Sequence, residues 1–321
     1  MRFLFVMDPA ATMHPTKDTT FAFLRGAHAR GHSSFHCLPK DISNEGREVA
    51  ARARPIRVQN AAPHVELGTE ERLDLAALDA VFIRKDPPFD SAYAHLTQQL
   101  ELVKDRVLIL NDPRGLREAN EKLFAFHFAE HMPRSLVTAR QDEIIAFVEA
   151  VGGRAVLKPI DGAGGAGVVV LSRDDRNTRS LADVWTEEGK RLALVQEYEP
   201  GVRTGDKRVL VLDGRPLGAI LRVPREDDVR ANIHAGGRVE PTELTQRERE
   251  IVHALGPKLV DYGLYFVGLD LIGERLIEVN VTSPTGIQEL SRFVGRPVEE
   301  DVIAWVEARA PERRAGGPTL H

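Results

Sequence analysis

The sequence predicts a combination of α/β and α+β architecture: a parallel-sheet domain at the N-terminus, then a region of hairpins and helices. Three observations support this prediction. Short apolar runs alternate with helical patterns over roughly the first 115 residues, as in parallel sheets. A glycine-rich stretch at residues 158–167 separates two strand-like segments, and a second hairpin pattern follows at residues 267–280. With 321 residues, the chain is long enough for two domains.

Composition and charge limit the classes of function. Charged residues make up 28% of the chain, with a net charge of −5 and acids and bases interspersed. This pattern favours a cytoplasmic protein and argues against nucleic acid or an anionic membrane as the main partner. The single cysteine, Cys37, excludes an internal disulfide, and its apolar neighbours indicate a buried thiol on a strand. The apolar run at residues 3–7 is too short for a signal peptide or a membrane span.

The N-terminal part contains clear strand and helix patterns. Strands are expected at residues 2–7, 34–38, 80–84 and 107–110, and helices at residues 21–30 and 92–103. Thr19 or Thr20 can cap the first helix, because a threonine hydroxyl accepts a hydrogen bond from a first-turn N–H. These elements predict a mostly parallel sheet.

Polar residues follow several of these strands and should share one rim of the sheet. Ligands bind beyond the carboxyl ends of strands in such sheets, which places Asp8, residues 84–90 and residues 111–113 together. The loop at residues 84–90 reads RKDPPFD. It is either a turn stiffened by proline or a segment whose Arg84 or Lys85 recognises a carboxylate.

Helices and strands continue in a less regular order downstream. Helices are expected at residues 123–130, 142–151, 180–189, 245–262 and 298–308, and strands at residues 134–139, 154–159, 168–171, 192–196, 207–212 and 217–223. His127 and His131 are four apart on the first of these helices, whose phenylalanines indicate a structural role for both. Residues 224–241 contain few apolar side chains and are expected to form a mobile loop, either a functional lid or a solvated linker.

The glycine-rich stretch KPIDGAGGAG, residues 158–167, is compatible with several kinds of loop. Gly162, Gly164 and Gly167 match GxGxxG, but a dinucleotide site needs a helix directly afterwards, and the VVVL run found here favours a strand. A Walker A loop would need Lys and Ser or Thr after the last glycine. A hairpin flap remains, whose backbone N–H groups can cover the phosphates of ATP. The same pattern also fits a plain flexible hairpin.

The segment DLIGERLIEVN, residues 270–280, carries polar side chains inside an apolar hairpin pattern. Glu278 and Asn280 are two apart on one strand and share a face. Asp270 joins that face, opposite Glu278, if the connection has an odd number of residues, most simply residues 273–275. A two-residue turn would instead place it opposite Ile277. Such oxygen ligands suit Mg²⁺ bound to phosphates, the alternative being an unpaired pair of surface acids.

Several motifs occur in the order and spacing of a known family. They are MDPxA, RKDPPFD, NEKLF, KPxDGxGGxG, GDKRVLV, AGGR, FVGLDxIG and ExNVTSPTGI. From residue 1 to residue 309 the chain therefore resembles the bacterial glutathione synthetases, which are ATP-grasp ligases. RKDPPFD and NVTSPT are the most specific of these motifs, since other ATP-grasp ligases share only the glycine flap and the metal strand.

The resemblance implies an N-terminal substrate (pre-ATP-grasp) domain at residues 1–119 and a two-lobed ATP-grasp domain at residues 120–310. The flap lobe would span residues 120–196 and the C-terminal lobe residues 197–310, with a disordered tail at residues 311–321. The implied reaction joins γ-glutamylcysteine to glycine and converts ATP to ADP and phosphate. The implied assembly is a homotetramer.

The resemblance also implies roles for particular residues. Those expected to contact ATP are Lys122, Lys158, Gly162, Gly164, Gly165, Gly167, Gln196, Glu197, Tyr198, Glu199 and Asp206. Those expected to hold Mg²⁺, or Mn²⁺ in its place, are Asp270, Glu278 and Asn280. Those expected to act on the reacting groups are Arg208, Arg222, Arg230 and Asn232. Those expected to bind the dipeptide are Lys17, Asp18, Arg84, Lys85, Ser283, Pro284 and Thr285.

The chain departs from the family pattern at three of these places. Glu197 and Glu199 stand where the family often has uncharged residues. Backbone contacts to adenine tolerate these acids, but the ribose could be held differently. Ala231 replaces a glycine of the family, and its methyl group could stiffen or shift the loop.

The chemistry explains why these residue types are present. A carboxylate is a poor electrophile, so ATP converts it to an acyl phosphate that an amine then attacks. Phosphoryl transfer needs positioning and charge neutralisation, which Lys, Arg and Mg²⁺ supply. Two alternatives stay open: an ATP-grasp ligase with another donor or acceptor, and a nucleotide-binding module without catalysis.

Overall fold

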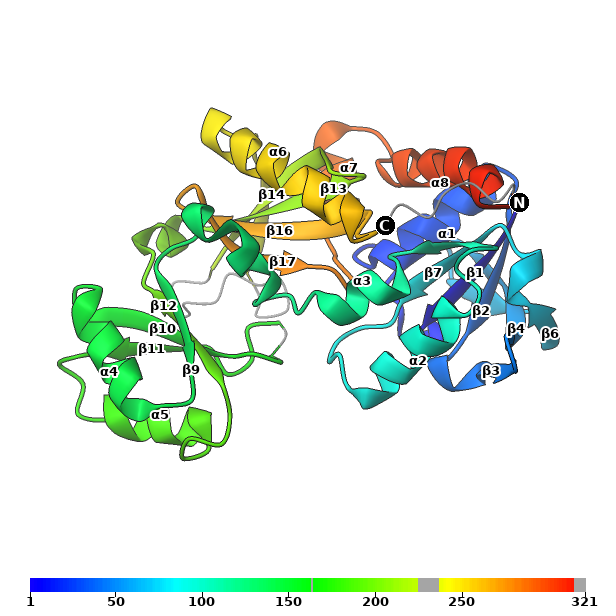
Figure 1. The fold of residues 1–321 in the computed structure, drawn as a ribbon. Coiled ribbons are helices and arrows are strands. Elements are labelled where there is room, and N and C mark those ends of the chain that lie inside the picture. Colours follow the sequence, from blue (N-terminus) through cyan, green and yellow to red (C-terminus); the bar gives the residue numbers. More distant parts are fainter. Residues whose placement is uncertain (163, 225–236, 315–321) are drawn as a thin grey trace.

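The computed structural model of the chain describes residues 1–162, 164–224 and 237–314. Three sheets organise these residues (Figure 1). The first is an eight-stranded N-terminal sheet, the second a four-stranded sheet and the third a five-stranded sheet. In Figure 1 the four-stranded sheet, with its helices α4 and α5, stands apart from the five-stranded sheet. Among the described residues, no helix combines the length and the apolar character needed to cross a membrane.

The centre of the N-terminal sheet is parallel, as predicted. Its strands are β1 (Arg2–Met7), β2 (Ser33–Cys37), β7 (Ala80–Arg84) and β8 (Leu108–Leu110), and its helices are α1 (Thr19–Ala29) and α2 (Ser91–Glu101). Residues 3–7 of β1 are all buried. A strand covered on both faces needs such an unbroken apolar run. Cys37 is a buried thiol, as expected.

Two details of this domain differ from the prediction. Four strands, β3 (Ile42–Glu45), β4 (Glu48–Val58), β5 (Val65–Leu67) and β6 (Glu71–Asp74), extend the sheet by antiparallel pairing, so it is mixed. Their charged side chains alternate with small buried ones, which hides the strand pattern. The cap of α1 is Asp18, not Thr19 or Thr20: its Oδ1 accepts a hydrogen bond from the Thr20 N–H at 2.9 Å.

The four-stranded sheet forms a lobe with its own core. Its strands are β9 (Ser135–Thr138), β10 (Arg154–Pro159), β11 (Val169–Ser172) and β12 (Ala193–Glu197), and they pair in the order β11-β10-β12-β9, all antiparallel. Helices α4 (Gln141–Ala150) and α5 (Thr178–Thr186) pack on one face through Ile144, Val148 and Ala182. The predicted hairpin around the glycine stretch is therefore confirmed as β10 and β11.

The five-stranded sheet forms the third unit. Its strands are β13 (Asp206–Leu212), β14 (Arg215–Val223), β15 (Arg238–Pro241), β16 (Phe266–Ile272) and β17 (Arg275–Asn280). Helix α6 (Gln246–Asp261) begins with a capping box in which Thr245 and Glu248 satisfy each other's N–H groups. The last helices are α7 (Ile287–Val294), which was not predicted, and α8 (Glu299–Arg314).

Several boundaries in this region correct the prediction. Residues 238–241, expected in a mobile loop, form β15 on the edge of the sheet. Residues 225–236, which include most of the expected lid, lie outside the described residues. Helix α8 continues to Arg314, so residues 311–314 of the expected tail are helical, and residues 315–321 are also outside the description.

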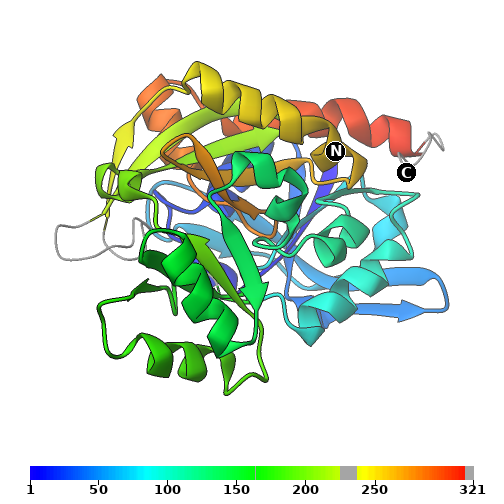
Figure 2. The same ribbon diagram turned by 60° about the vertical axis from the view of Figure 1, so that its left-hand side comes forward.

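Connecting segments tie the units together. Helix α3 (Pro113–Glu118) and a 3₁₀ helix (Phe124–His131), at the place of the predicted helix 123–130, lead from the N-terminal sheet to β9. Helix α8 returns to the N-terminal domain and packs on α1, where Arg25 forms an ion pair with Glu299 at 2.5 Å. Figure 2, turned from the first view, shows α6 and α8 along the same side of the molecule. The division at residues 119 and 120 stays a prediction.

Candidate active site

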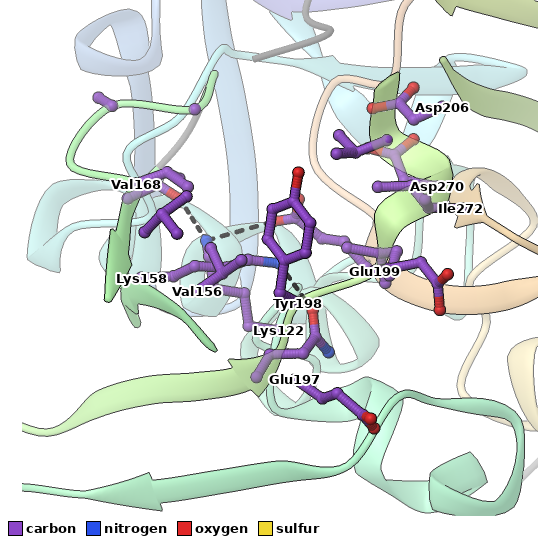
Figure 3. Close-up of a pocket in the computed structure, with 18 of the residues that line it drawn as sticks. Lys122, Val156, Lys158, Val168, Glu197, Tyr198, Glu199, Asp206, Asp270 and Ile272 are labelled. Atoms are coloured by element: carbon purple, nitrogen blue, oxygen red, sulfur yellow. Dashed lines mark hydrogen bonds and ion pairs between the residues drawn. The ribbon is translucent and has the colours of Figure 1, made fainter. Parts of the chain in front are cut away.

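A cavity lies between the four-stranded and five-stranded sheets (Figure 3). Its lining includes Lys122, Lys158, Gly162, Gly164, Gly165, Gln196, Glu197, Tyr198, Glu199, Asp206, Asp270 and Glu278. Ten of these were predicted as ATP contacts and two as metal ligands. Gly167 and Asn280 belong to the same predicted sets but do not line the cavity.

Lys158 enters the cavity from β10 and is held by β12. Its ammonium group donates a hydrogen bond to Oε1 of Gln196 at 2.9 Å, and the Gln196 amide donates onward to the Ser135 hydroxyl at 3.0 Å. Burial lowers the pKa of Lys158 to about 8; Glu278 opposes this shift and Lys122 adds to it. The hydrogen bond to Gln196 therefore fixes the position of the Lys158 ammonium group before a ligand binds. The surroundings of this group would favour an anionic ligand.

Lys122 joins the glycine loop to the hairpin of β16 and β17. Its ammonium group donates a hydrogen bond to the carbonyl of Gly162 and lies 3.2 Å from Oε1 of Glu278. In the loop itself, Gly164 and Gly165 have φ values of 61° and 76°. Only glycine adopts that region at low cost, so these positions let backbone N–H groups turn toward the cavity.

The end of the glycine loop is anchored separately. Nε1 of Trp185, on α5, donates a hydrogen bond to the carbonyl of Gly167 at 2.5 Å. Gly167 thus lies at the base of the flap rather than in the wall of the cavity. This anchor was not predicted, because it joins two segments that are separated along the chain.

Apolar side chains form the rest of the cavity wall, and they were not predicted. They are Val156, Val168, Val170, Val202, Ile272 and Ile277. One signal could have identified the first of them: Val156 is two residues before Lys158, so the period of two along a strand places both on one face.

A buried cluster of charges lies at the end of the cavity that carries Asp206 and Asp270. Arg208 contacts both carboxylate oxygens of Asp270, at 2.5 and 3.1 Å, and Arg222 lies 2.9 Å from the same carboxylate. Arg222 also donates to Asp206 at 2.5 Å. Burial alone would raise the pKa of Asp270, but Arg208 and Arg222 outweigh burial and hold that pKa below its ordinary value. Asp270 is thus kept as a carboxylate facing two guanidinium groups.

The hairpin of β16 and β17 places Asp270 directly opposite Glu278, as predicted, but by a different route. The connection has two residues, Gly273 and Glu274, with φ values of 56° and 62°. A β-bulge then breaks the register: Leu271 pairs with Leu276 and Asp270 with Glu278, so Ile277 is the extra residue. The expected three-residue connection is wrong, because the bulge supplies the odd residue instead.

The predicted metal ligands consist of two carboxylates and an amide. Nδ2 of Asn280 donates to the carbonyl of Gly268 at 3.1 Å, which leaves its oxygen available. Among the described residues, no group of three or more His, Cys, Asp and Glu side chains is arranged to hold a metal. The set of Asp270, Glu278 and Asn280 nevertheless has the all-oxygen chemistry of a Mg²⁺ site that is completed by phosphate oxygens.

On the side of the N-terminal domain, Arg84 connects the predicted dipeptide-binding segments. It is buried and donates to the Thr20 hydroxyl and to the carbonyl of Pro284, both at 3.1 Å. Arg208 donates to the carbonyl of Thr285 at 3.3 Å. The loop at residues 283–285 is therefore held between the rim of the first sheet and the arginine cluster.

Several other residues with predicted roles in binding or catalysis lie outside this loop and the cavity. Asp18 uses its carboxylate to cap α1. Lys85 lies 5.3 Å from the centre of the Tyr93 ring, and Lys17 is exposed. Arg230 and Asn232 lie outside the described residues. His131 lies 3.1 Å from a guanidinium nitrogen of Arg247, in keeping with a structural role.

Comparisons with known proteins identify the family. The sequence models described as "Prokaryotic glutathione synthetase, N-terminal domain" and "Prokaryotic glutathione synthetase, ATP-grasp domain" match residues 1–117 and residues 121–295. The chain belongs to the prokaryotic glutathione synthetase family. Curated relatives named glutathione synthetase include those of Gloeobacter violaceus, 43% identical, and Agrobacterium fabrum, 44% identical. The matches cover 95% and 91% of this chain and 96% and 92% of those relatives.

Solved structures support the fold. The D-cycloserine synthetase DcsG matches 95% of this chain and 100% of its own, with a TM-score of 0.64 at 16% identity. The ATP-grasp ligase PsnB, complexed with a precursor peptide and AMPPNP, matches 96% of this chain and 98% of its own, with a TM-score of 0.62 at 17% identity. At such identities the likeness shows the ATP-grasp fold alone.

Proposed function

We propose that this protein is a glutathione synthetase, which joins γ-glutamylcysteine to glycine with hydrolysis of ATP to ADP and phosphate. One observation carries the proposal beyond family membership. The cavity brings Lys122, Lys158 and the glycine loop together with Asp270 and Glu278, from three separate segments of the chain. Such a set suits the phosphates of a nucleotide and the cation that accompanies them.

Each group of residues around the cavity has a separate role in this proposal. The apolar wall around Val156 and Ile277 encloses the adenine, and the backbone of residues 196–199 pairs with its edge. Lys122 and Lys158 hold the phosphates under the glycine loop. Mg²⁺ or Mn²⁺, held by Asp270, Glu278 and Asn280, would neutralise phosphate charge. Arg208 and Arg222 face the phosphoryl group that is transferred.

The reaction then proceeds in two steps. The cysteinyl carboxylate of the dipeptide attacks the γ-phosphorus, which breaks the bond to ADP and forms an acyl phosphate. The amine of glycine attacks the carbonyl carbon, phosphate leaves, and the amine loses a proton as the peptide bond forms. Arg84 and residues 283–285 orient the dipeptide. We also propose that the enzyme works in the cytoplasm as a homotetramer.

A single assay tests this function. Phosphate release is measured with ATP, Mg²⁺ and γ-glutamylcysteine while the acceptor amine is varied, and the peptide product is quantified. We expect one phosphate per glutathione formed, and glycine as the preferred acceptor. Preference for another amine would indicate a different ATP-grasp ligase. Nucleotide binding without phosphate release would indicate a module without catalysis.

A further inference from the structure

Glu121 holds the end of strand β17 and the residues after it at three positions, Val279, Val281 and Thr282. Its Oε1 accepts hydrogen bonds from the N–H of Val281 at 3.0 Å, the N–H of Thr282 at 3.2 Å and the hydroxyl of Thr282 at 2.9 Å. Its backbone carbonyl accepts a fourth from the N–H of Val279 at 3.0 Å. Three N–H groups of residues 279–282 are therefore bound by one residue, more than 150 positions earlier in the chain, while the carbonyl of Val281 accepts a hydrogen bond from Nδ2 of Asn111 at 2.8 Å.

This arrangement is stronger than ordinary chain packing. Two successive N–H groups that converge on one oxygen form an anion-binding turn. A largely enclosed carboxyl group costs free energy unless it is well bonded. The three hydrogen bonds to the Glu121 side chain offset that cost, and together with the fourth, to its backbone carbonyl, they leave the segment little freedom to shift.

The position of Glu121 is close to the groups that react. It lines a second cavity together with Lys122, Gly162 and Thr282. Lys122 and Gly162 also line the nucleotide cavity, so the two cavities meet at the contact between these residues.

The segment that Glu121 holds leads directly into the substrate-facing loop. Thr282 precedes residues 283–285, whose carbonyl groups are bound by Arg84 at Pro284 and by Arg208 at Thr285. The start of the loop is thus attached to Glu121, its middle to the N-terminal sheet and its end to the arginine cluster. Only the first of these attachments comes from the residue next to the phosphate-binding Lys122.

We propose that Glu121 is a positioning residue, which sets the place of the loop at residues 282–285 relative to Lys122 and so aligns the dipeptide carboxylate with the γ-phosphate. The proposal rests on the proposed ligase function. It assigns Glu121 no chemical step. Because a displacement of about 1 Å can cost about 100-fold in rate, a loop that drifts should impair the dipeptide more than the nucleotide.

The test uses three variants and one control in the full-length protein. Glu121→Ala removes the acceptor, Glu121→Gln keeps an acceptor oxygen without the charge, and Thr282→Val removes one donor at nearly constant shape. Glu118→Ala is the control, since this acid on α3 is exposed and, among the residues that the structure describes, its ion pair is with Arg114, at 2.7 Å. KM for ATP, KM for γ-glutamylcysteine and kcat are measured for each, together with amide hydrogen exchange at residues 281–285.

For Glu121→Ala we expect KM for the dipeptide to rise about tenfold or more, with KM for ATP within about threefold of wild type. The dipeptide KM of Glu121→Gln should lie much closer to the wild-type value. Thr282→Val should raise the dipeptide KM less than Glu121→Ala does. Amide exchange at Val281 and Thr282 should accelerate in the alanine variant. Glu118→Ala should match wild type.

Equal rises in both KM values, or a lower melting temperature with unchanged KM values, would overturn the proposal. If Glu121→Ala does not fold, Thr282→Val provides the test. A wild-type dipeptide KM in Thr282→Val would count against the positioning role of Glu121. If the wild-type enzyme does not ligate the dipeptide, the proposed function fails, whereas the exchange measurement still tests the positioning. Unchanged amide exchange at residues 281–285 in Glu121→Ala would refute the positioning role of Glu121.

Discussion

The pKa of Lys158 predicts how nucleotide affinity depends on pH. Burial lowers that pKa to about 8, while the phosphates of a bound nucleotide favour the charged form. The free enzyme therefore loses the proton as pH rises through 8, and nucleotide binding must restore it. The charged fraction falls from about three quarters at pH 7.5 to about 3% at pH 9.5. If only the ammonium form binds phosphate, the nucleotide Kd rises roughly 25-fold over this range.

The assay measures Kd for a non-hydrolysable ATP analogue at saturating Mg²⁺ from pH 7.5 to 9.5. Calorimetry in two buffers of different ionisation enthalpy adds the number of protons taken up on binding. Lys158→Arg is the matched control, because a guanidinium group stays charged throughout and should give a flat profile. A flat wild-type profile, or the same rise in Lys158→Arg, would refute the assignment to Lys158.

Three further changes should have separate signatures. Glu278→Gln should lower ligation by at least about 100-fold, because the proposed metal ligand loses its charge, with an unchanged circular dichroism spectrum; near wild-type turnover at saturating Mg²⁺ would contradict this. Gly115→Ala should destabilise the protein by about 3 kcal/mol in urea unfolding, since the new Cβ would lie 1.9 Å from a backbone carbonyl oxygen; unchanged stability would contradict the packing. Trp185→Phe removes the donor to Gly167 and should raise KM for ATP about fivefold. The indole nitrogen of Trp305 has no hydrogen-bond partner among the described residues, so Trp305→Phe should leave KM for ATP unchanged.

Local patterns were enough to predict much of the fold. The apolar run of β1, the hairpin of β10 and β11 and the helix that begins at Thr245 are specified by side-chain period, glycine spacing and capping residues. These signals lie within a few residues of one another. The motifs shared with the family likewise point to Lys122, Lys158 and Gln196, and in the structure these three residues line one cavity.

Tertiary structure decided the features that depend on distant partners. The bulge at Ile277 restores the pairing of Asp270 with Glu278, because the register is set by packing between strands as well as by the turn. The charged strand β4 is stabilised by four neighbouring strands rather than by its own pattern. The role of Glu121 rests on hydrogen bonds to residues about 160 positions away, which no local pattern encodes. The sequence by itself therefore determined those helices, strands and motifs whose signals are local, whereas three-dimensional packing decided the antiparallel strands β3 to β6 and which polar groups meet.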